Sequence, residues 1–280
     1  MNKLDLKARA HILACLVEGN SIRATVRMTG AAKNTVVKLL ADVGAACAAY
    51  QDKALRNLPC KRIQCDEIWS FVYAKQKNVA DAKAAPEGAG DAWTWTAIDA
   101  DTKLVASWMI GPRDGGIAYD FMQDLAGRLA SRVQLTTDGH KAYLEAVEAA
   151  FGADIDYAML VKIYGEPKNK SPERKYSPSS FCGTRVSTVT GDPEADAIST
   201  SYVERQNLTM RMSMRRFTRL TNGFSKKLEN LGHAVALHFM YYNFGRIHQS
   251  LRITPAMAAG VSDHVWSLEE IAALADSESN

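Results

Sequence analysis

The sequence has no run of about 18 consecutive apolar residues, which is close to the least that a membrane-spanning helix needs. Its first apolar run is short and is flanked by Asp5 and Glu18, so it does not resemble a signal peptide. We therefore expect a protein with no membrane partner and a cytoplasmic location.

Cysteine is scarce as well. The five cysteines have no regular spacing, which is typical of a reducing compartment and not of a disulfide framework. Cys60 and Cys65 are the closest pair, but no further cysteine or histidine pair with zinc-ligand spacing accompanies them. No zinc site is expected. The net charge of +3 is too small to identify a binding partner, so the distribution of charge has to do that.

Residues 4–47 have the hydrophobic spacing of three helices, and a turn containing Gly30 separates the second from the third. A short helix, a glycine turn and a third helix are the outline of a helix-turn-helix, which predicts a DNA-binding domain at residues 1–48. The exposed early turns of the third helix carry the DNA-binding candidates Lys33, Asn34, Thr35 and Lys38. The alternative is a small bundle that packs on the rest of the protein.

A linker is expected at residues 49–61, and the pattern changes after it. Three β-rich segments come first, and helices and strands then alternate, which predicts a mixed α/β sheet domain over residues 62–260. Residues 165–196 contain several prolines and read as one long loop. Two long helices are expected after it, at about residues 199–215 and 225–244. A Ser267/Glu270 capping box predicts a short closing helix, so residues 261–280 form a carboxyl-terminal helix and tail.

Three acidic residues lie where a fold of this order would bring them together. Asp66 is in the middle of the first strand, Asp138 ends the fourth, and Glu204 is in the helix after the long loop. Such carboxylates repel one another unless a hard divalent cation binds between them, and Mg²⁺ prefers oxygen ligands. Two such ions would clamp the attacking and leaving oxygens of a phosphodiester displacement. Taken singly, Asp138-Gly139 is an ordinary turn and Glu204 an ordinary solvated helix charge.

Glu67 follows Asp66 directly within the same apolar strand. In a regular strand its side chain must point to the opposite face from that of Asp66. We therefore expect Glu67 to pair with a basic residue, or to support the metal ligands from behind, and not to bind metal itself.

Acidic residues are absent from residues 205–227. The basic residues there are Arg205, Arg211, Arg215, Arg216, Arg219, Lys226 and Lys227. At about 100° per residue, Arg211 and Arg215 lie within roughly 40° of Glu204 if the helix is unbroken. Guanidinium groups beside a carboxylate site suit a groove that follows phosphates, so Arg205, Arg211, Arg215 and Arg216 are DNA-binding candidates. A basic run is also often no more than a solvated helix face.

The segments CDEIWSFV, TTDGHKAY and SYVERQNLTMRMSMRRFTRLTNGFSK, in that order, resemble the motifs of bacterial DDE transposases, and most closely those of the insertion-sequence-one family and its relatives. YYNFGRIHQSLRITPAMAAG resembles the tail of many such enzymes. The resemblance covers roughly residues 62–260. It implies an RNase H-like core and two Mg²⁺ ions, for which Mn²⁺ can substitute. Asp66, Asp138 and Glu204 would be the catalytic metal ligands.

The resemblance also implies a function and a setting. A transposase of this kind binds terminal inverted repeats and target DNA, works as a homodimer or higher oligomer on DNA, and is associated with the bacterial nucleoid. Members often begin with a zinc finger, for which this sequence has no ligand set. The alternatives are a catalytically inactive or domesticated helix-turn-helix protein and a nuclease of the same superfamily. An enzyme is favoured because all three carboxylates are present.

Overall fold

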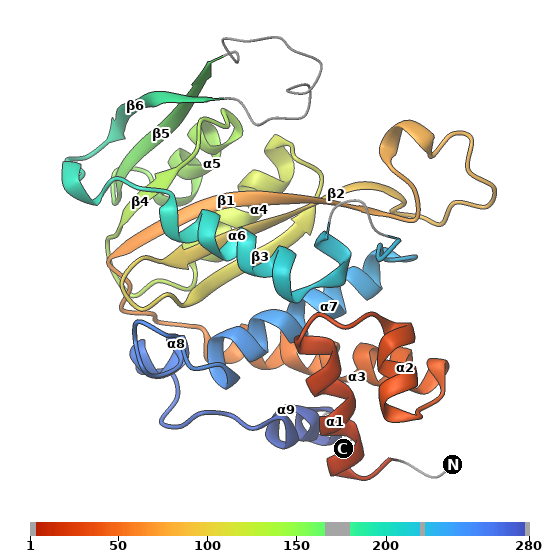
Figure 1. The fold of residues 1–280 in the computed structure, drawn as a ribbon. Helices are drawn as coiled ribbons and strands as arrows, with labels where there is room; N and C mark the ends of the chain where they lie inside the picture. Colours follow the sequence, from red (N-terminus) through yellow and green to blue (C-terminus); the bar gives the residue numbers. More distant parts are fainter. Residues whose placement is uncertain (1–3, 166–179, 219–221, 278–280) are drawn as a thin grey trace.

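A computed structural model describes residues 4–165, 180–218 and 222–277, and these contain a six-stranded mixed sheet (Figure 1). The strands are β1 (Arg62–Val72), β2 (Gly90–Asp99), β3 (Val105–Gly111), β4 (Gln134–Thr137), β5 (Asp156–Gly165) and β6 (Ser180–Thr190). Their order is β3-β2-β1-β4-β5-β6. β4 runs parallel to both β1 and β5, and the other neighbouring pairs are antiparallel. The predicted mixed α/β class is confirmed.

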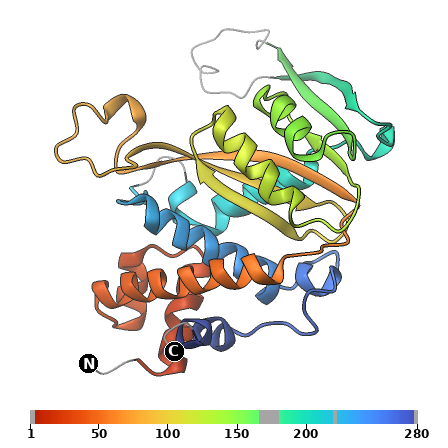
Figure 2. The ribbon, with the colours of Figure 1, turned by 180° about the vertical axis from the view of Figure 1, so that it is seen from behind.

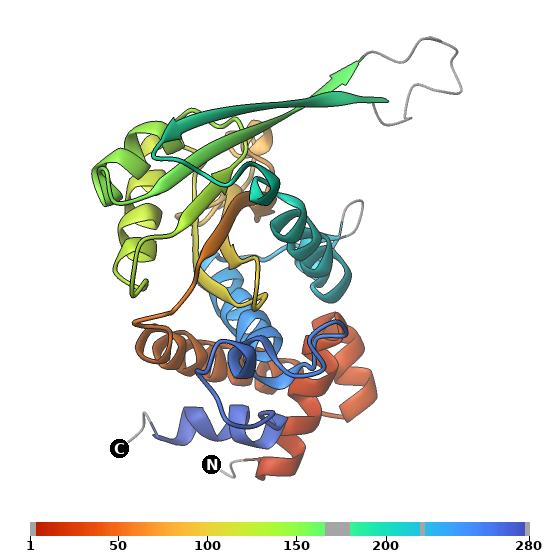
Figure 3. The ribbon, with the colours of Figure 1, turned by 90° about the vertical axis from the view of Figure 1, so that its left-hand side faces the viewer.

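Helices cover both faces of the sheet. α4 (Gly115–Ala126) and α5 (Ala142–Phe151) lie on the face that is in front in Figure 2. α6 (Ser201–Ser213) and α7 (Leu228–Met240) lie on the other face, as Figures 1 and 3 show. Strands covered on both faces bury side chains in both directions, and β1 and β2 accordingly have buried residues at consecutive positions.

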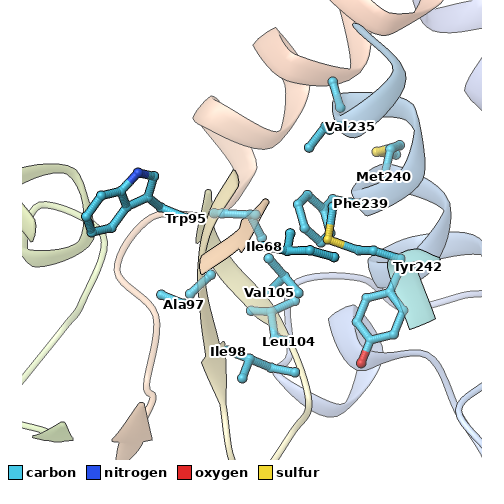
Figure 4. Close-up of a cluster of buried hydrophobic side chains, with 14 of the residues drawn as sticks. Ile68, Trp95, Ala97, Ile98, Leu104, Val105, Val235, Phe239, Met240 and Tyr242 are labelled. Atoms are coloured by element: carbon cyan, nitrogen blue, oxygen red, sulfur yellow. The ribbon is translucent and has the colours of Figure 1, made fainter. Parts of the chain in front are cut away.

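The side chains of the central strands pack into the apolar core on both faces of the sheet. Trp95 of β2 lies 5.5 Å from the Tyr143 ring of α5, measured between centroids, and is fully buried. In Figure 4 it points away from Ile68, Val105 and the α7 side chain Phe239, which pack together on the other face. The sheet is therefore held in place from both sides, and a strand within it has a fixed register.

A helical layer lies beneath the sheet in the view of Figure 3. It contains α1 (Leu6–Val17), α2 (Ile22–Thr29), α3 (Lys33–Ala54) and α9 (Leu268–Ser277). The three predicted amino-terminal helices are thus confirmed as helices. α3 packs against α7, and α9 packs against α1 and α3. A Cβ atom added at Gly44 of α3 would lie 2.5 Å from the Cβ of His233, so the two helix backbones approach closely there.

The linker predicted at residues 49–61 is wrong in its first half, because α3 continues to Ala54. Tertiary contacts explain the extension. The Tyr50 ring packs on Trp266, with ring centroids 4.8 Å apart, and the buried Gln51 donates an Nε2 hydrogen bond of 3.1 Å to the Ala236 carbonyl of α7. Helix-forming residues that gain such contacts remain helical, so the helical layer is joined to the sheet domain by packing.

The single loop predicted for residues 165–196 is also wrong, because β6 occupies part of it and pairs with β5 from Tyr157↔Thr190 to Gly165↔Ser180. The described side chains of β6 are mostly exposed, so the strand lacks the apolar alternation that would have revealed it. Residues 166–179 of the predicted loop lie outside the described residues. In Figure 3 the β5–β6 hairpin extends away from the body.

The carboxyl-terminal half contains several short elements. A 3₁₀ turn (Arg215–Phe217) follows α6, a π-helical turn (Tyr241–Gly245) follows α7, and α8 spans Pro255–Ala258. Two further 3₁₀ turns span Gln76–Asn78 and Ala195–Ala197. The predicted capping box is confirmed, since Ser267 Oγ accepts from the Glu270 amide at 3.2 Å and Glu270 accepts from the Ser267 amide at 2.7 Å. Over the described part of the chain, no helix has both the length and the apolar character to cross a membrane.

Candidate active site

Two carboxylates meet where β4 ends beside the longer β1. β1 pairs with β4 only from Arg62 to Cys65, opposite Gln134 to Thr137. Asp66 is the next residue of β1, and Asp138 directly follows the end of β4, so both come after the last paired position of the same parallel pair. The carboxyl ends of parallel strands are where open α/β sheets usually bind ligands. Sheet geometry therefore brings together two residues that are 72 positions apart in the sequence, which is the difference between 138 and 66.

Asp66 is held in position by two hydrogen bonds. Its Oδ1 accepts from the Glu67 amide at 2.8 Å, and its Oδ2 accepts from Nδ2 of Asn207 in α6 at 2.9 Å. Burial raises the pKa of Asp66 to about 7, and the carboxylates of Glu67, Asp138 and Glu204 contribute further to the increase. Its surroundings therefore favour either a proton or a metal cation at this carboxylate near neutral pH.

Glu67 has the basic partner that the sequence predicted. Arg113, in the turn between β3 and α4, donates from Nε to Glu67 at 2.8 Å and from a terminal nitrogen to Asp138 at 3.2 Å. Burial raises the pKa of Glu67, whereas the Arg113 guanidinium acts in the opposite direction. Arg113 was not anticipated. The only sequence signal for it is a lone arginine in GPRDGG, directly after the third strand.

Glu204 lies on α6 and has partners of its own. Its Oε1 accepts from the Thr200 hydroxyl at 2.7 Å, and its Oε2 accepts from Lys162 Nζ of β5 at 2.5 Å. Glu204 lines a cavity of about 660 Å³ together with Asp66 and Asp138. The three residues predicted from the sequence therefore share one cavity, and Lys162 is an additional member of the site.

The most compact acidic group differs from that triad. Asp66, Glu67 and Asp138 each offer a carboxylate oxygen, and these three oxygens lie within 4.8 Å of one another. Glu204 lies outside this group, where Lys162 holds it. Glu67 thus lies closer to the other carboxylates than the sequence analysis expected, although it also forms an ion pair with Arg113.

β1 also fixes the position of α6. The side-chain oxygen of Gln64 accepts from the backbone amides of Tyr202 and Val203, at 2.8 and 3.2 Å. The first amides of a helix have no partners within the helix, so this contact anchors the start of α6 on the sheet. One strand therefore carries Asp66 and also orients the helix that supplies Glu204 and Asn207.

The donor set fits a hard divalent cation. All three oxygens of the compact group are carboxylate oxygens, the ligand type that Mg²⁺ prefers. In addition, Oε1 of Glu67 is buried, and the hydroxyl of Tyr143, which lies beside this carboxylate, lowers the pKa of Glu67. Burying negative charge costs free energy, and a cation in the cavity would offset part of that cost for these carboxylates.

The DNA-binding candidates in the amino-terminal unit lie at the start of α3. Lys33, Asn34 and Lys38 are exposed there, Thr35 is half-buried, and Lys38 forms an ion pair with Asp42 at 2.6 Å. Asn34 is not buried against α1, an outcome that would have excluded α3 as a recognition helix. Groove recognition by these side chains stays a prediction.

The four arginine candidates after Glu204 are placed differently from one another. Arg211 is on α6, on the Glu204 side by helical geometry, and is half-buried. The assumption of an unbroken helix is wrong for Arg215, because α6 ends at Ser213 and Met214 has an extended backbone. Arg216 is half-buried and donates from Nε to Ser225 at 2.8 Å. Arg205 lines a different cavity from Glu204.

Comparisons with known proteins find loose similarity at the level of structure and none at the level of sequence. No protein-family model matches the sequence, and no curated protein matches it. Among solved structures, the piggyBac transposase in a synaptic complex with hairpin DNA is similar, with a TM-score of 0.40 and 12% sequence identity over 99% of this chain and 71% of that chain. The two folds coincide only loosely at this score.

Proposed function

We propose that this protein is a DNA transposase that binds the terminal repeats of a mobile element and catalyses metal-dependent strand cleavage and strand transfer. The observation that carries the proposal is the shared cavity of Asp66, Asp138 and Glu204, which come from β1, the end of β4 and α6. The strand order β3-β2-β1-β4-β5, with β1 parallel to β4, supports the RNase H-like core that the resemblance to DDE transposases implies.

Asp66, Asp138 and Glu204 are the proposed ligands of Mg²⁺, and Mn²⁺ is the expected substitute. Bound there, the ions would activate the attacking oxygen and stabilise the leaving oxygen of a phosphodiester. Asn207 keeps Asp66 in one orientation, and Gln64 keeps α6 in place. Glu204 has to exchange its contact with Lys162 for the metal.

Arg113 has a separate task in this proposal. Through its two hydrogen bonds it neutralises the buried Glu67 and orients Asp138. The side chain of Glu67 is 1% exposed, so its charge would otherwise be buried without a partner. Arg113 thereby leaves Asp66 as the carboxylate that most needs a cation.

The test is Asp66→Asn, with Asp120→Asn on the exposed surface of α4 as the matched control. Duplexes ending in the inverted repeats that flank the gene are supplied pre-cut with Mg²⁺ or Mn²⁺, and joining to a plasmid is measured. We expect Asp66→Asn to lower joining by at least about 100-fold, because the ligand that fixes the ions is lost. Affinity for the repeats should stay within about twofold, since binding rests mainly on phosphate contacts elsewhere.

Three results would contradict the proposal. If the wild-type protein binds the repeats but joins nothing, it is a DNA-binding protein without this activity. If it cleaves but never joins pre-cut ends, it is a nuclease. If Asp66→Asn joins as efficiently as Asp120→Asn, Asp66 does not act in the reaction.

A further inference from the structure

A second cavity, which the proposed reaction does not use, lies beside α6. Its volume is about 390 Å³, and its basic lining residues are Lys103, Arg205, Arg246 and His248. Tyr202 and Thr209 of α6 line it as well. We call it the basic pocket. No aspartate or glutamate is among its lining residues.

α6 separates the basic pocket from the acidic cavity. At about 100° per residue, Thr200 and Asn207 lie within roughly 60° of Glu204 around the helix axis. The pocket residues Arg205 and Thr209 lie about 100° to 140° away from Glu204, on another side of the helix. One helix therefore presents carboxylate chemistry to one cavity and positive charge to the other.

The two arginines of the basic pocket have no carboxylate partner in the part of the chain that the structure describes. Arg205 and Arg246 are exposed, and across the described ranges neither guanidinium forms an ion pair with a carboxylate. Burial lowers the pKa of His248, and the charges of Lys103, Arg246 and Arg205 lower it further. These groups therefore act on one another at close range, which costs free energy unless an anion joins them.

Lys103 is the most constrained member of the group. It is 9% exposed, and its ammonium lies 3.5 Å from the centroid of the Tyr202 ring and donates to the Ala100 carbonyl. Its backbone adopts a φ of 62°, in the left-handed region that non-glycine residues seldom occupy. A lysine ammonium held at a buried position by such contacts is a built feature of the pocket and not a freely solvated surface charge.

We propose that the basic pocket binds a backbone phosphate of duplex DNA, at a position separate from the strand that the carboxylates act on. Two guanidinium groups with no carboxylate partner among the described residues suit the tetrahedral oxygens of a phosphate. The assignment rests on the proposed function for the identity of the anion. Arg205 would then contact DNA from a different side of α6 than Arg211.

The test compares the double variant Arg205→Ala/Arg246→Ala with Lys53→Ala/Lys83→Ala, which removes two exposed positive charges elsewhere. Both are made in full-length protein carrying Asp66→Asn, and binding to fluorescent duplex DNA is measured by anisotropy in EDTA at several salt concentrations. The slope of log affinity against log salt should fall by about one if the arginines share a phosphate and by about two if they hold separate ones. The lysine control should keep its slope within about half a unit.

A slope equal to that of the lysine control would overturn the proposal. Arg205→Lys/Arg246→Lys retains the charges and should restore the slope, whereas a purely structural role for the arginines would lower the melting temperature and leave the slope unchanged. No metal or cleavage enters this measurement. The two proposals can therefore fail separately. If the arginine variant lowers the slope but the wild-type protein joins no DNA, the pocket is supported and the transposase proposal is refuted. If the wild-type protein joins DNA but the arginine variant leaves the slope unchanged, the transposase proposal is supported and the pocket is refuted.

Discussion

At the scale of single residues, the protonation of Asp66 sets the conditions for metal binding. Its pKa is raised to about 7, above its ordinary value of 3.8, so at pH 6 the carboxyl is mostly protonated. A metal ligand has to be deprotonated, and protons therefore compete with the cation below pH 7. We expect Mn²⁺ affinity to rise by up to about tenfold per pH unit as the pH increases towards 7 and to level off above it.

Mn²⁺ titrations between pH 5.5 and 8.5, followed by calorimetry, check this dependence. Asp66→Asn removes the titrating group, so the variant should bind weakly at every pH and show a flatter profile. An affinity of the wild-type protein that stays constant from pH 5.5 to pH 8.5 would mean that Asp66 is not the ligand that protons and metal compete for.

At the scale of elements, the close contact of α3 with α7 can be tested with one methyl group. Gly44→Ala places a Cβ atom 2.5 Å from the Cβ of His233 and 2.6 Å from its carbonyl oxygen, so one helix has to move. Overpacking of this kind costs about 1 to 3 kcal/mol of unfolding free energy. Gly232→Ala in α7 is the matched control, because its added methyl group meets nothing within 4 Å.

Urea unfolding of both variants provides the measurement. The control should gain about 0.5 to 1 kcal/mol, since alanine is a better helix former than glycine. If Gly44→Ala were as stable as Gly232→Ala, the two helices would not pack backbone to backbone in solution.

The sequence could predict most elements because each has a local signal. Helical spacing marked α1 to α3, and Ser267 marked the start of α9. β6 has no such signal, since its side chains are largely exposed and only its pairing with β5 makes it a strand. The end of α6 at Ser213 was missed for a similar reason, because the basic sequence continues past it without a glycine or proline.

The residues of the candidate site also divide into those with a local sequence signal and those without one. Asp66 was detectable because a carboxylate within an apolar run needs a partner. Arg113 and Lys162 could not be assigned, since a lone arginine in a turn and a lysine at a strand end are common and only the tertiary structure brings them to Glu67 and Glu204. Sequence order alone could not show that Glu67 lies within 4.8 Å of the other two carboxylates.

At the scale of the whole molecule, the continuous apolar core predicts cooperative unfolding. Buried side chains of α1, α3 and α7 belong to the same cluster as those of the sheet, and Arg9 of α1 bonds to Asp276 of α9 at 2.8 Å. We expect helix loss by far-ultraviolet circular dichroism and tryptophan fluorescence to report the same midpoint in urea, because Trp95 in the sheet core and Trp266 beside Tyr50 of α3 both pack on one apolar cluster. Residues 1–48 alone should not fold stably.

Two separated transitions would contradict this expectation and would support an independent amino-terminal domain. The matched check uses α9. Arg9→Ala removes a partly buried ion pair and should shift both signals together. If only the helical signal moved, the helical layer would unfold by itself.

The position of α6 between two cavities also limits how the gene can change. Deleting or inserting one codon between those for Thr200 and Thr209 would rotate every later residue by about 100° around the helix. Asn207 would then leave Asp66, and Thr209 would leave the basic pocket, in a single event. Substitutions can alter the two cavities one at a time, whereas a length change alters both at once. We expect relatives of this protein to vary in length on either side of α6 and to keep the same number of residues within it.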